Sequence, residues 1–592
     1  MKHQLRFACL AAAFGIASVG PSWAGTAQGS PTPTPIKHLI VIFQENVSFD
    51  HYFATYPEAE NNPGETPFKA NRHSPTRINT LRTPLDVSND FRPLQNVDLL
   101  NANPNGPSGS GAQINGQDAR NPFRLAPSQA LTSDQGHNYK PEQQASDNGL
   151  MDSFPAFVGA GGTPPGTGKW LVMGYYDGNT VTALWNYAQH FAINDNSWTT
   201  TFGPSTPGAL NLIAGQTSGF DEYTNVVDSG GNLLHPTHEV GDGNGNYTEI
   251  GDGDPLYDVC SSTTIDQIAM HGRNIGDLLN AHDISWGWFE GGFDLTVVNP
   301  DGTTGCNRHT NPTAPGTPES TSNDYIPHHE PFQYFASTRN PSHARPSSVA
   351  AIGHTLIPGT DQPDPANHQY DINDFFAALN AGGLPSVSFL KAAAFEDGHA
   401  GYSDPLDEQH FLVRVLNAVQ KSPEWKSTAV VIAYDDSDGW YDHQAPPIVN
   451  PSSSTADALN GANLCNIGLQ QGQVAPETPL NGSFGYPAQG RCGYGTRLPL
   501  LVISPYAKVN YVDHTLTDQS SILRFIEDNW LSGERIQPGG SFDSIANMIE
   551  NMFNFERQPE QPRTLILDEV TGARVHPSAG RAKAAGRNGD HD

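Results

Sequence analysis

Two short apolar runs in this chain each end in a pair of oxygen-bearing side chains. The runs are HLIVIF at residues 38–43 and AVVIAY at residues 429–434. Glu45 and Asn46 follow the first run, and Asp435 and Asp436 follow the second. Continuous apolar runs of this length are typical of strands buried on both faces of a parallel sheet. Because ligands gather at the carboxyl ends of such strands, the four polar side chains would meet there if the two strands lie close together.

The rest of the chain extends this pattern of strands and helices. Strands are predicted over 36–43, 429–434 and 498–504, and helices over 182–190, 275–281, 372–381, 408–421 and 519–530. Strands alternating with helices predict an α/β fold with a mostly parallel central sheet and helices on both faces. Gly-, Asn- and Pro-rich segments are expected to be long loop insertions over the carboxyl ends of the strands: 57–130, 225–260, 300–325 and 445–495.

The two ends of the chain differ in composition from the region between them. Residues 1–24 combine a basic start, an apolar run and a small-x-small site, which predicts a removable signal peptide and a secreted or periplasmic protein. The alternative is that this segment stays uncleaved as an N-terminal anchor. No later apolar run is long enough to span a membrane, so once the signal peptide is removed we expect no stable membrane insertion. Residues 25–35 are a Pro/Thr linker, and the polar stretch 571–592 is expected to be disordered. A single domain is predicted over 36–570.

The charge of the chain excludes one class of partner. There are 62 Asp and Glu residues against 31 Lys and Arg, for a formal net charge of −31. Such a surface repels nucleic acid, so we expect no DNA or RNA partner. A phosphate-bearing substrate would need local positive charge, most simply from a bound metal ion.

The cysteines predict disulfide bonds. Of five cysteines, Cys9 lies in the predicted signal peptide, which leaves four. An even number in an exported chain favours disulfides, and of three possible pairings we favour the local one, Cys260–Cys306 with Cys465–Cys492. None stands in a CxxC motif, so a zinc–thiolate site is not expected.

The four residues at the two strand ends have the chemistry of a metal site. Three carboxylates and an amide oxygen are hard ligands, suited to Ca²⁺, Mg²⁺, Mn²⁺ or iron. Carboxylates gathered this closely would raise one another's pKa without a cation to neutralise them. The alternative is that these acids cap helices or line a wet loop. Matched endings on two strands favour the metal site.

Ser205 is a candidate nucleophile. It stands in GPSTPGALNLIAG, directly before a helical pattern, and could simply cap that helix. A hydroxyl at a helix N-terminus beside a metal ion could instead attack phosphorus, with backbone N–H groups holding the phosphoryl group. The GxSxG elbow of serine hydrolases is absent, because Pro207 replaces the second glycine.

Histidines add a further group of candidates. His328 and His329 are adjacent in PHHEPFQYF, while His399 lies in FEDGHAGYSDP and His137 in SDQGHNYKPEQQ. A lone histidine is more often structural than catalytic, but an adjacent pair followed by aromatic residues favours a functional site.

Two other metal motifs fail. No HExxH is present, which excludes zincin chemistry. An EF-hand loop starting at Asp242 would need glycine at 247 and glutamate at 253, but those residues are Tyr247 and Gly253. We therefore expect residues 241–254 to form a turn-rich loop.

Taken in order, these motifs resemble those of the bacterial phospholipase C/acid phosphatase family of phosphoesterases, relatives of the alkaline phosphatase superfamily. The resemblance runs from the first strand to about residue 530. It rests on ENVSFDHYF, NGLMDSF, MGYY, GPSTP, HHEPFQYF, the His399 loop, YDDSDGWYDH and DHTLTDQSSILRFIEDNW. It implies an alkaline-phosphatase-like fold.

The resemblance also implies roles for individual residues. Glu45, Asn46, Asp435 and Asp436 match the family's metal ligands, Ser205 its nucleophile, and His137, His328, His329 and His399 its phosphate-pocket histidines. The implied reaction passes through a phosphoserine or phosphodiester-serine intermediate that water hydrolyses. One divalent ion is implied, with Ca, Mg, Mn, Zn and Fe all open. The implied substrate is a phospholipid or a small phosphomonoester. A histidine-lined pocket further predicts an acidic optimum, since an unperturbed histidine is charged below about pH 6.5.

The chain departs from the family pattern at two places. Val47 stands where arginine is usual, and PGA at 207–209 replaces the PNR that is common in phosphocholine-specific members. Both weaken the case for a choline headgroup and leave the hydrolytic residues intact.

Two other functions stay open. A sulfatase-like hydrolase would need C/S-x-P-x-R, but Ala209 occupies the arginine position. A non-catalytic secreted binding protein on the same fold would be favoured by loss of the nucleophile or a ligand, all of which are present. The sequence leaves the oligomeric state unknown.

Overall fold

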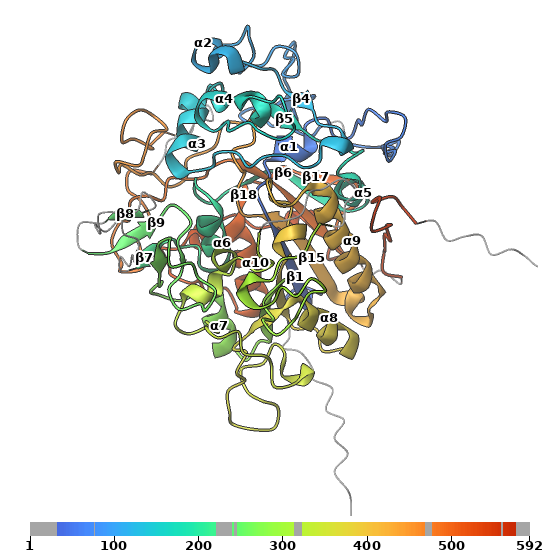
Figure 1. Ribbon diagram of the computed structural model, residues 1–592, viewed down its shortest axis with the longest axis vertical. Helices are drawn as coiled ribbons and strands as arrows, with labels where there is room; N and C mark the ends of the chain where they lie inside the picture. Colours follow the sequence, from blue (N-terminus) through green and yellow to red (C-terminus); the bar gives the residue numbers. More distant parts are fainter. Residues whose placement is uncertain are drawn as a thin grey trace, which may run out of the picture.

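A computed structural model describes residues 32–575 except 76, 221–238, 242–244, 313–321, 468–475 and 558–560. The predicted signal peptide, most of the predicted linker and residues 576–592 lie outside these ranges. Within them, no helix has the length and apolar character needed to cross a membrane. Figure 1 shows a broad central sheet with helices and long loops around it.

A nine-stranded sheet forms the centre of the protein. Its order is β13-β12-β14-β1-β15-β16-β6-β17, with β18 also paired to β6. The strands are β1 (His38–Gln44), β6 (Ala192–Trp198), β12 (Trp286–Glu290), β13 (Gln369–Asp371), β14 (Val387–Lys391), β15 (Thr428–Tyr434), β16 (Arg497–Ile503), β17 (Tyr511–Asp513) and β18 (Thr517–Asp518). β15 and β6 both pair antiparallel with β16, and every other pairing in this sheet is parallel. The predicted mostly parallel α/β sheet is confirmed.

The two acid-ended strands are direct neighbours. β1 and β15 run parallel over their full length, with Gln44 opposite Tyr434. Residues 39–44 of β1 and all of β15 are buried, as expected for strands covered on both faces. The third predicted strand is also present as β16, but it runs against β15, a direction that an apolar run alone does not specify.

The predicted helices are all present. They are α5 (Thr182–His190), α7 (Ile275–Ala281), α8 (Ile372–Ala381), α9 (Pro405–Lys421) and α10 (Gln519–Trp530). The described residues form further helices that were not in the predicted set: α1 (Phe49–Phe53), α2 (Ala112–Asn115), α3 (Tyr139–Ser146), α4 (Phe154–Phe157) and α6 (Ser205–Ala214). In Figure 1, β1 and β15 lie between α6 and α10 on one side and α8 and α9 on the other.

Short strands outside the central sheet pair locally. They are β2 (Leu85–Asp86) with β3 (Arg92–Pro93), β4 (Phe123–Arg124) with β5 (Gly174–Tyr175), β10 (Asp254–Pro255) with β11 (Gln267–Ile268), and β9 (Tyr247–Glu249) between β7 (Ser218–Phe220) and β8 (Glu239–Gly241). The predicted disulfides Cys260–Cys306 and Cys465–Cys492 are both formed.

The start of the predicted disordered tail is ordered. The Asn186 side chain donates a hydrogen bond to the Gly572 carbonyl, and Arg574 pairs with Leu567 in a β-bridge. Residues 571–575 therefore pack against the domain. Composition did not reveal this, because the contacts join these residues to partners that are distant in sequence, such as Asn186.

Candidate active site

The two strand ends are bonded to each other directly after the sheet. The Asp435 N–H donates to the Gln44 carbonyl at 3.2 Å, and the Val47 N–H donates to the Asp436 carbonyl at 2.9 Å. Between them, the Asn46 N–H donates to Asp435 Oδ1 at 3.0 Å. Asn46 has φ of 58°, a left-handed conformation that asparagine tolerates better than most residues. The predicted juxtaposition of these residues is confirmed.

Ser205 lies against both strand ends. It is the first residue of α6, and its Oγ is 3.1 Å from Glu45 Oε2, 3.0 Å from Asp436 Oδ2 and 3.3 Å from Asn46 Oδ1. The helix can approach this closely because of Gly208, where a Cβ atom would come within 2.3 Å of the Asp435 carbonyl oxygen. We call Glu45, Asn46, Asp435, Asp436 and Ser205 the serine cluster.

The serine cluster has more acceptors than donors. One hydroxyl proton can satisfy only one of the three oxygens around Ser205 Oγ. Asp435 Oδ2 is buried and forms no hydrogen bond with any described residue. Burial raises the pKa of Asp436 to about 7 and that of Asp435 well above its ordinary value. Converging hard oxygens, one of them without a hydrogen bond, fit a divalent metal ion.

The Asn46 amide has two reasonable orientations. With its oxygen inward it adds a third acceptor beside Ser205. Turned over, its nitrogen donates to Glu45 Oε2 at 2.9 Å and to Asp436 Oδ2 at 3.2 Å, and its oxygen lies 3.0 Å from His399 Nε2. Only the first orientation presents a ligand oxygen to a cation.

Two of the predicted histidines lie against the serine cluster. His329 Nδ1 is 3.4 Å from Glu45 Oε1. The His399 ring stacks on Tyr402 with its Nδ1 2.5 Å from the Ala400 carbonyl oxygen. Burial lowers the pKa of both rings, that of His399 to about 4, so both are neutral.

The other two histidines are backed by carboxylates. His137 Nδ1 lies 3.1 Å from Asp438 Oδ1, and His328 Nδ1 lies 3.5 Å from Asp254 Oδ1. Burial by itself lowers the pKa of each ring, but the nearby carboxylates outweigh it. The net effect raises the pKa of His137 well above its ordinary value and that of His328 to about 9. These directions give two charged and two neutral histidines around the serine cluster near neutral pH.

Sequence reasoning missed several residues at this site. Lys391 contacts Glu45 Oε1 and lies 3.6 Å from Asp435 Oδ2. It ends the apolar run of β14, which is the same signal that identified the other two strand ends. Glu142 was missed as well. It accepts from the Gly203 N–H at 3.0 Å and from Ser437 Oγ at 2.7 Å, tying the serine loop to the second strand end.

The segment 241–254 also contributes to the site. Asp254 backs His328, and Asp252 Oδ1 accepts the Thr206 N–H at 3.0 Å. These contacts change the expectation that backbone N–H groups at the start of α6 hold a phosphoryl group. Pro207 has no N–H, and the Thr206 N–H is already bonded to Asp252. Fewer backbone donors of α6 are free to hold a phosphoryl group than its N-terminal position predicted.

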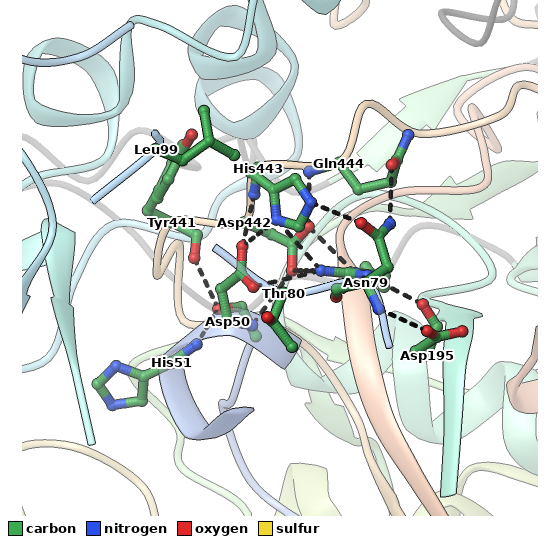
Figure 2. Close-up of polar contacts among 12 residues, drawn as sticks. Asp50, His51, Asn79, Thr80, Leu99, Asp195, Tyr441, Asp442, His443 and Gln444 are labelled. Atoms are coloured by element: carbon green, nitrogen blue, oxygen red, sulfur yellow. Dashed lines mark hydrogen bonds and ion pairs between the residues drawn. The ribbon is translucent and has the colours of Figure 1, made fainter. Parts of the chain in front are cut away.

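A second group of buried acids lies a few residues further along the two segments that follow β1 and β15. Arg497 Nη2 is 3.3 Å from Asp50 Oδ1 and 3.1 Å from Asp442 Oδ2, and His443 Nδ1 is 2.6 Å from Asp50 Oδ2. Figure 2 shows the Asp50 and Asp442 carboxyl groups and the His443 ring facing one another, with Asn79 beside the ring. We call Asp50, Asp442, His443 and Arg497 the arginine cluster.

Comparison with known proteins is consistent with the geometry. The family model of the phosphoesterase family matches residues 36–531. The chain is 31% identical over 202 residues to a non-hemolytic phospholipase C of Pseudomonas aeruginosa, covering 33% of this chain and 28% of the relative. It is 34% identical over 148 residues to a non-hemolytic phospholipase C of Burkholderia pseudomallei (25% and 19%), and 24% identical over 201 residues to phospholipase C A of Mycobacterium tuberculosis (34% and 35%).

These matches are partial. The matched segments span about a fifth to a third of each relative's own length. A solved structure, titled for glycosaminoglycan metabolism by Bacteroides thetaiotaomicron, aligns at 11% identity with a TM-score of 0.26, covering 74% of this chain and 82% of that one. That likeness is too weak to bear on the fold.

Proposed function

The chain belongs to the phosphoesterase family, and from that membership we propose that it hydrolyses phosphoric esters through Ser205 with one divalent metal ion. The observation that carries the proposal is the convergence at Ser205 Oγ. One carboxylate oxygen from each of two adjacent strand ends lies within 3.1 Å of it, with the Asn46 amide at 3.3 Å, and all three side chains are buried. A helix cap would need none of them. The resemblance to phospholipases C supports a phospholipid or a small phosphomonoester as substrate.

The metal would be held by Glu45, Asn46, Asp435 and Asp436. Their oxygens are the hard donors that Ca²⁺, Mg²⁺, Mn²⁺ and iron prefer, and zinc also stays open. When bound, the ion would supply positive charge for the phosphoryl oxygens and lower the pKa of the attacking hydroxyl.

Ser205 forms and then breaks the covalent bond to phosphorus. Its Oγ attacks phosphorus, the bond from phosphorus to the leaving alcohol breaks, and the hydroxyl proton passes to Asp436 Oδ2. Water then attacks the phosphoserine, or phosphodiester-serine, and releases the product and free Ser205.

The histidines divide the remaining work by their charge. His137 and His328, held as cations by carboxylates, can stabilise the phosphoryl oxygens, and one of them can give its proton to the leaving alkoxide. His329 and His399 are neutral, border the serine cluster and can hydrogen-bond the phosphoryl group.

The remaining expectations belong to the same proposal. We propose a single domain over 36–570 with an alkaline-phosphatase-like arrangement and loop insertions above the strand ends. Export by the N-terminal signal would make it a secreted or periplasmic enzyme.

The test is hydrolysis of p-nitrophenyl phosphate and p-nitrophenyl phosphorylcholine by the wild type and by Ser205→Ala, with and without chelator. We expect the wild type to cleave at least one ester and Ser205→Ala to lose that activity. Ser504→Ala is the matched control, because this buried serine bonds the Thr428 carbonyl at the opposite end of β15. Full activity in Ser205→Ala would make Ser205 a helix cap. No cleavage by the wild type with any divalent metal would favour a binding protein instead.

A further inference from the structure

Lys391 is the one ammonium group that the structure places in contact with the serine cluster among the described residues. Its side chain is only 1% exposed. It contacts Glu45 Oε1, and its Nζ lies 3.6 Å from Asp435 Oδ2, the carboxylate oxygen that has no hydrogen bond. A buried lysine is costly unless it is paired, so its position between these two acids is specific.

The contact divides the two oxygens of Glu45. Oε1 faces Lys391 and His329, whereas Oε2 faces Ser205. With Oε1 engaged, Glu45 can offer only Oε2 to a cation in the serine cluster. A bidentate carboxylate is thereby excluded while the lysine is in place.

The charges give the lysine a second consequence. The three carboxylates of the serine cluster carry −3 when ionised, and Lys391 brings the group to −2, which one divalent ion balances. The other groups facing Lys391 do not replace it. His329 contacts the same Glu45 oxygen through a ring nitrogen at 3.4 Å, and Asp397 is a further buried acid that accepts hydrogen bonds from the His399 N–H and from Tyr402 Oη.

We propose that Lys391 is a positioning residue of the metal centre: it fixes Glu45 with a single oxygen toward Ser205 and acts as a resident counter-charge that limits metal affinity. This rests on the proposed function. Lys391 therefore stabilises the metal-free protein. It also lowers the affinity of the serine cluster for a metal ion, as expected for a cation placed beside a cation site.

Lys391→Met separates this role from that of an ordinary buried ion pair. We expect the melting temperature of the metal-stripped protein to fall, and Mn²⁺ to bind about tenfold more tightly by calorimetric titration. Arg124→Met is the matched control, because Arg124 pairs with Glu65 and Asp177 away from the serine cluster. It should lower the melting temperature and leave the affinity for Mn²⁺ unchanged.

The outcomes separate the two proposals. If the wild type binds no divalent cation, the metal part of the proposed function fails. If the wild type binds Mn²⁺ and Lys391→Met binds it equally or more weakly, only the role of Lys391 is overturned. Should Lys391→Met not fold, Lys391→Gln keeps a donor to Glu45 without the charge and must show the same gain in Mn²⁺ affinity.

Discussion

The acids of the serine cluster and those of the arginine cluster lie on the same two segments, 45–50 and 435–443, but the two clusters are completed in opposite ways. In the arginine cluster, the guanidinium of Arg497 and the ring of His443 face the carboxylates of Asp50 and Asp442. In the serine cluster, Lys391 faces Glu45 and Asp435, and a single hydroxyl faces Glu45 and Asp436. One carboxylate oxygen is left without a hydrogen bond to any described residue.

The difference separates acids that are paired within the fold from acids that we propose to bind a metal ion. His443 has both ring nitrogens engaged, with Nε2 2.9 Å from Asn79 Oδ1 (Figure 2). The same Asn79 atom accepts the Leu85 N–H, which identifies it as the amide oxygen. The His443 ring therefore donates a hydrogen bond to it. The arginine cluster is therefore satisfied by its own chain. The serine cluster is not, which is typical of a site that gives up stability for function.

The largest expected effect is on activity in the serine cluster. Asp436→Asn should lower kcat/KM by about 10²- to 10³-fold, because it removes a charge beside the reacting hydroxyl. Its melting temperature in metal-free buffer should hold or rise, since one of several crowded like charges is gone. Steady-state kinetics and calorimetry check both. A variant that melts at a lower temperature and keeps normal turnover would contradict the distinction between the clusters.

The arginine cluster should respond in stability. Arg497→Met leaves Asp50 and Asp442 buried without their cation, which costs about 3–5 kcal/mol of unfolding free energy. Denaturant titration measures this. Arg273→Met is the control, because the Arg273–Glu534 pair is half exposed and should matter little. Equal stability of the two variants would show that the arginine cluster is not structural.

Removing metal should act on one cluster alone. Chelation should lower the melting temperature of the wild type, because a ligand that binds only the folded state stabilises it. In Asp436→Asn the chelator should have little effect, whereas Asp442→Asn should keep the wild-type response. Calorimetric scans with and without EDTA measure the difference. An equal loss of response in both variants would place the metal elsewhere.

The smallest effect concerns pH. The expected acidic optimum assumed unperturbed histidines, but His328 has its pKa raised to about 9. A raised pKa means that the imidazolium persists through neutrality and is lost as pH rises through about 9. We therefore expect the alkaline limb of kcat/KM near pH 9, moving toward 6.5 in Asp254→Asn. An unchanged limb in that variant would remove His328 from the reaction.

Much of the fold followed from apolar periodicity, and its limits are physical. β1 and β15 were predicted because both are buried on two faces and read as continuous apolar runs. β6 was missed because AINDNSW carries polar residues at buried positions, where tertiary hydrogen bonds satisfy them. The direction of β16 depends on chain connectivity rather than on its own side chains.

The candidate site followed the same division. The residues at strand ends and in paired motifs were found, and the structure brings Ser205 to both strand ends. Asp252 and Asp254 were set aside because the EF-hand comparison tests spacing within one loop, whereas their partners Thr206 and His328 are distant in sequence. Lys391 was missed because no strand was predicted over 387–391.

The most direct measurement is acid quenching of the wild type during turnover of p-nitrophenyl phosphate, followed by peptide mass spectrometry. Our account predicts a phosphoryl group on the peptide that contains Ser205, in the wild type and absent from Ser205→Ala. A turning-over enzyme with no phosphorylated residue, or with the phosphoryl group on another side chain, would contradict the proposed nucleophile.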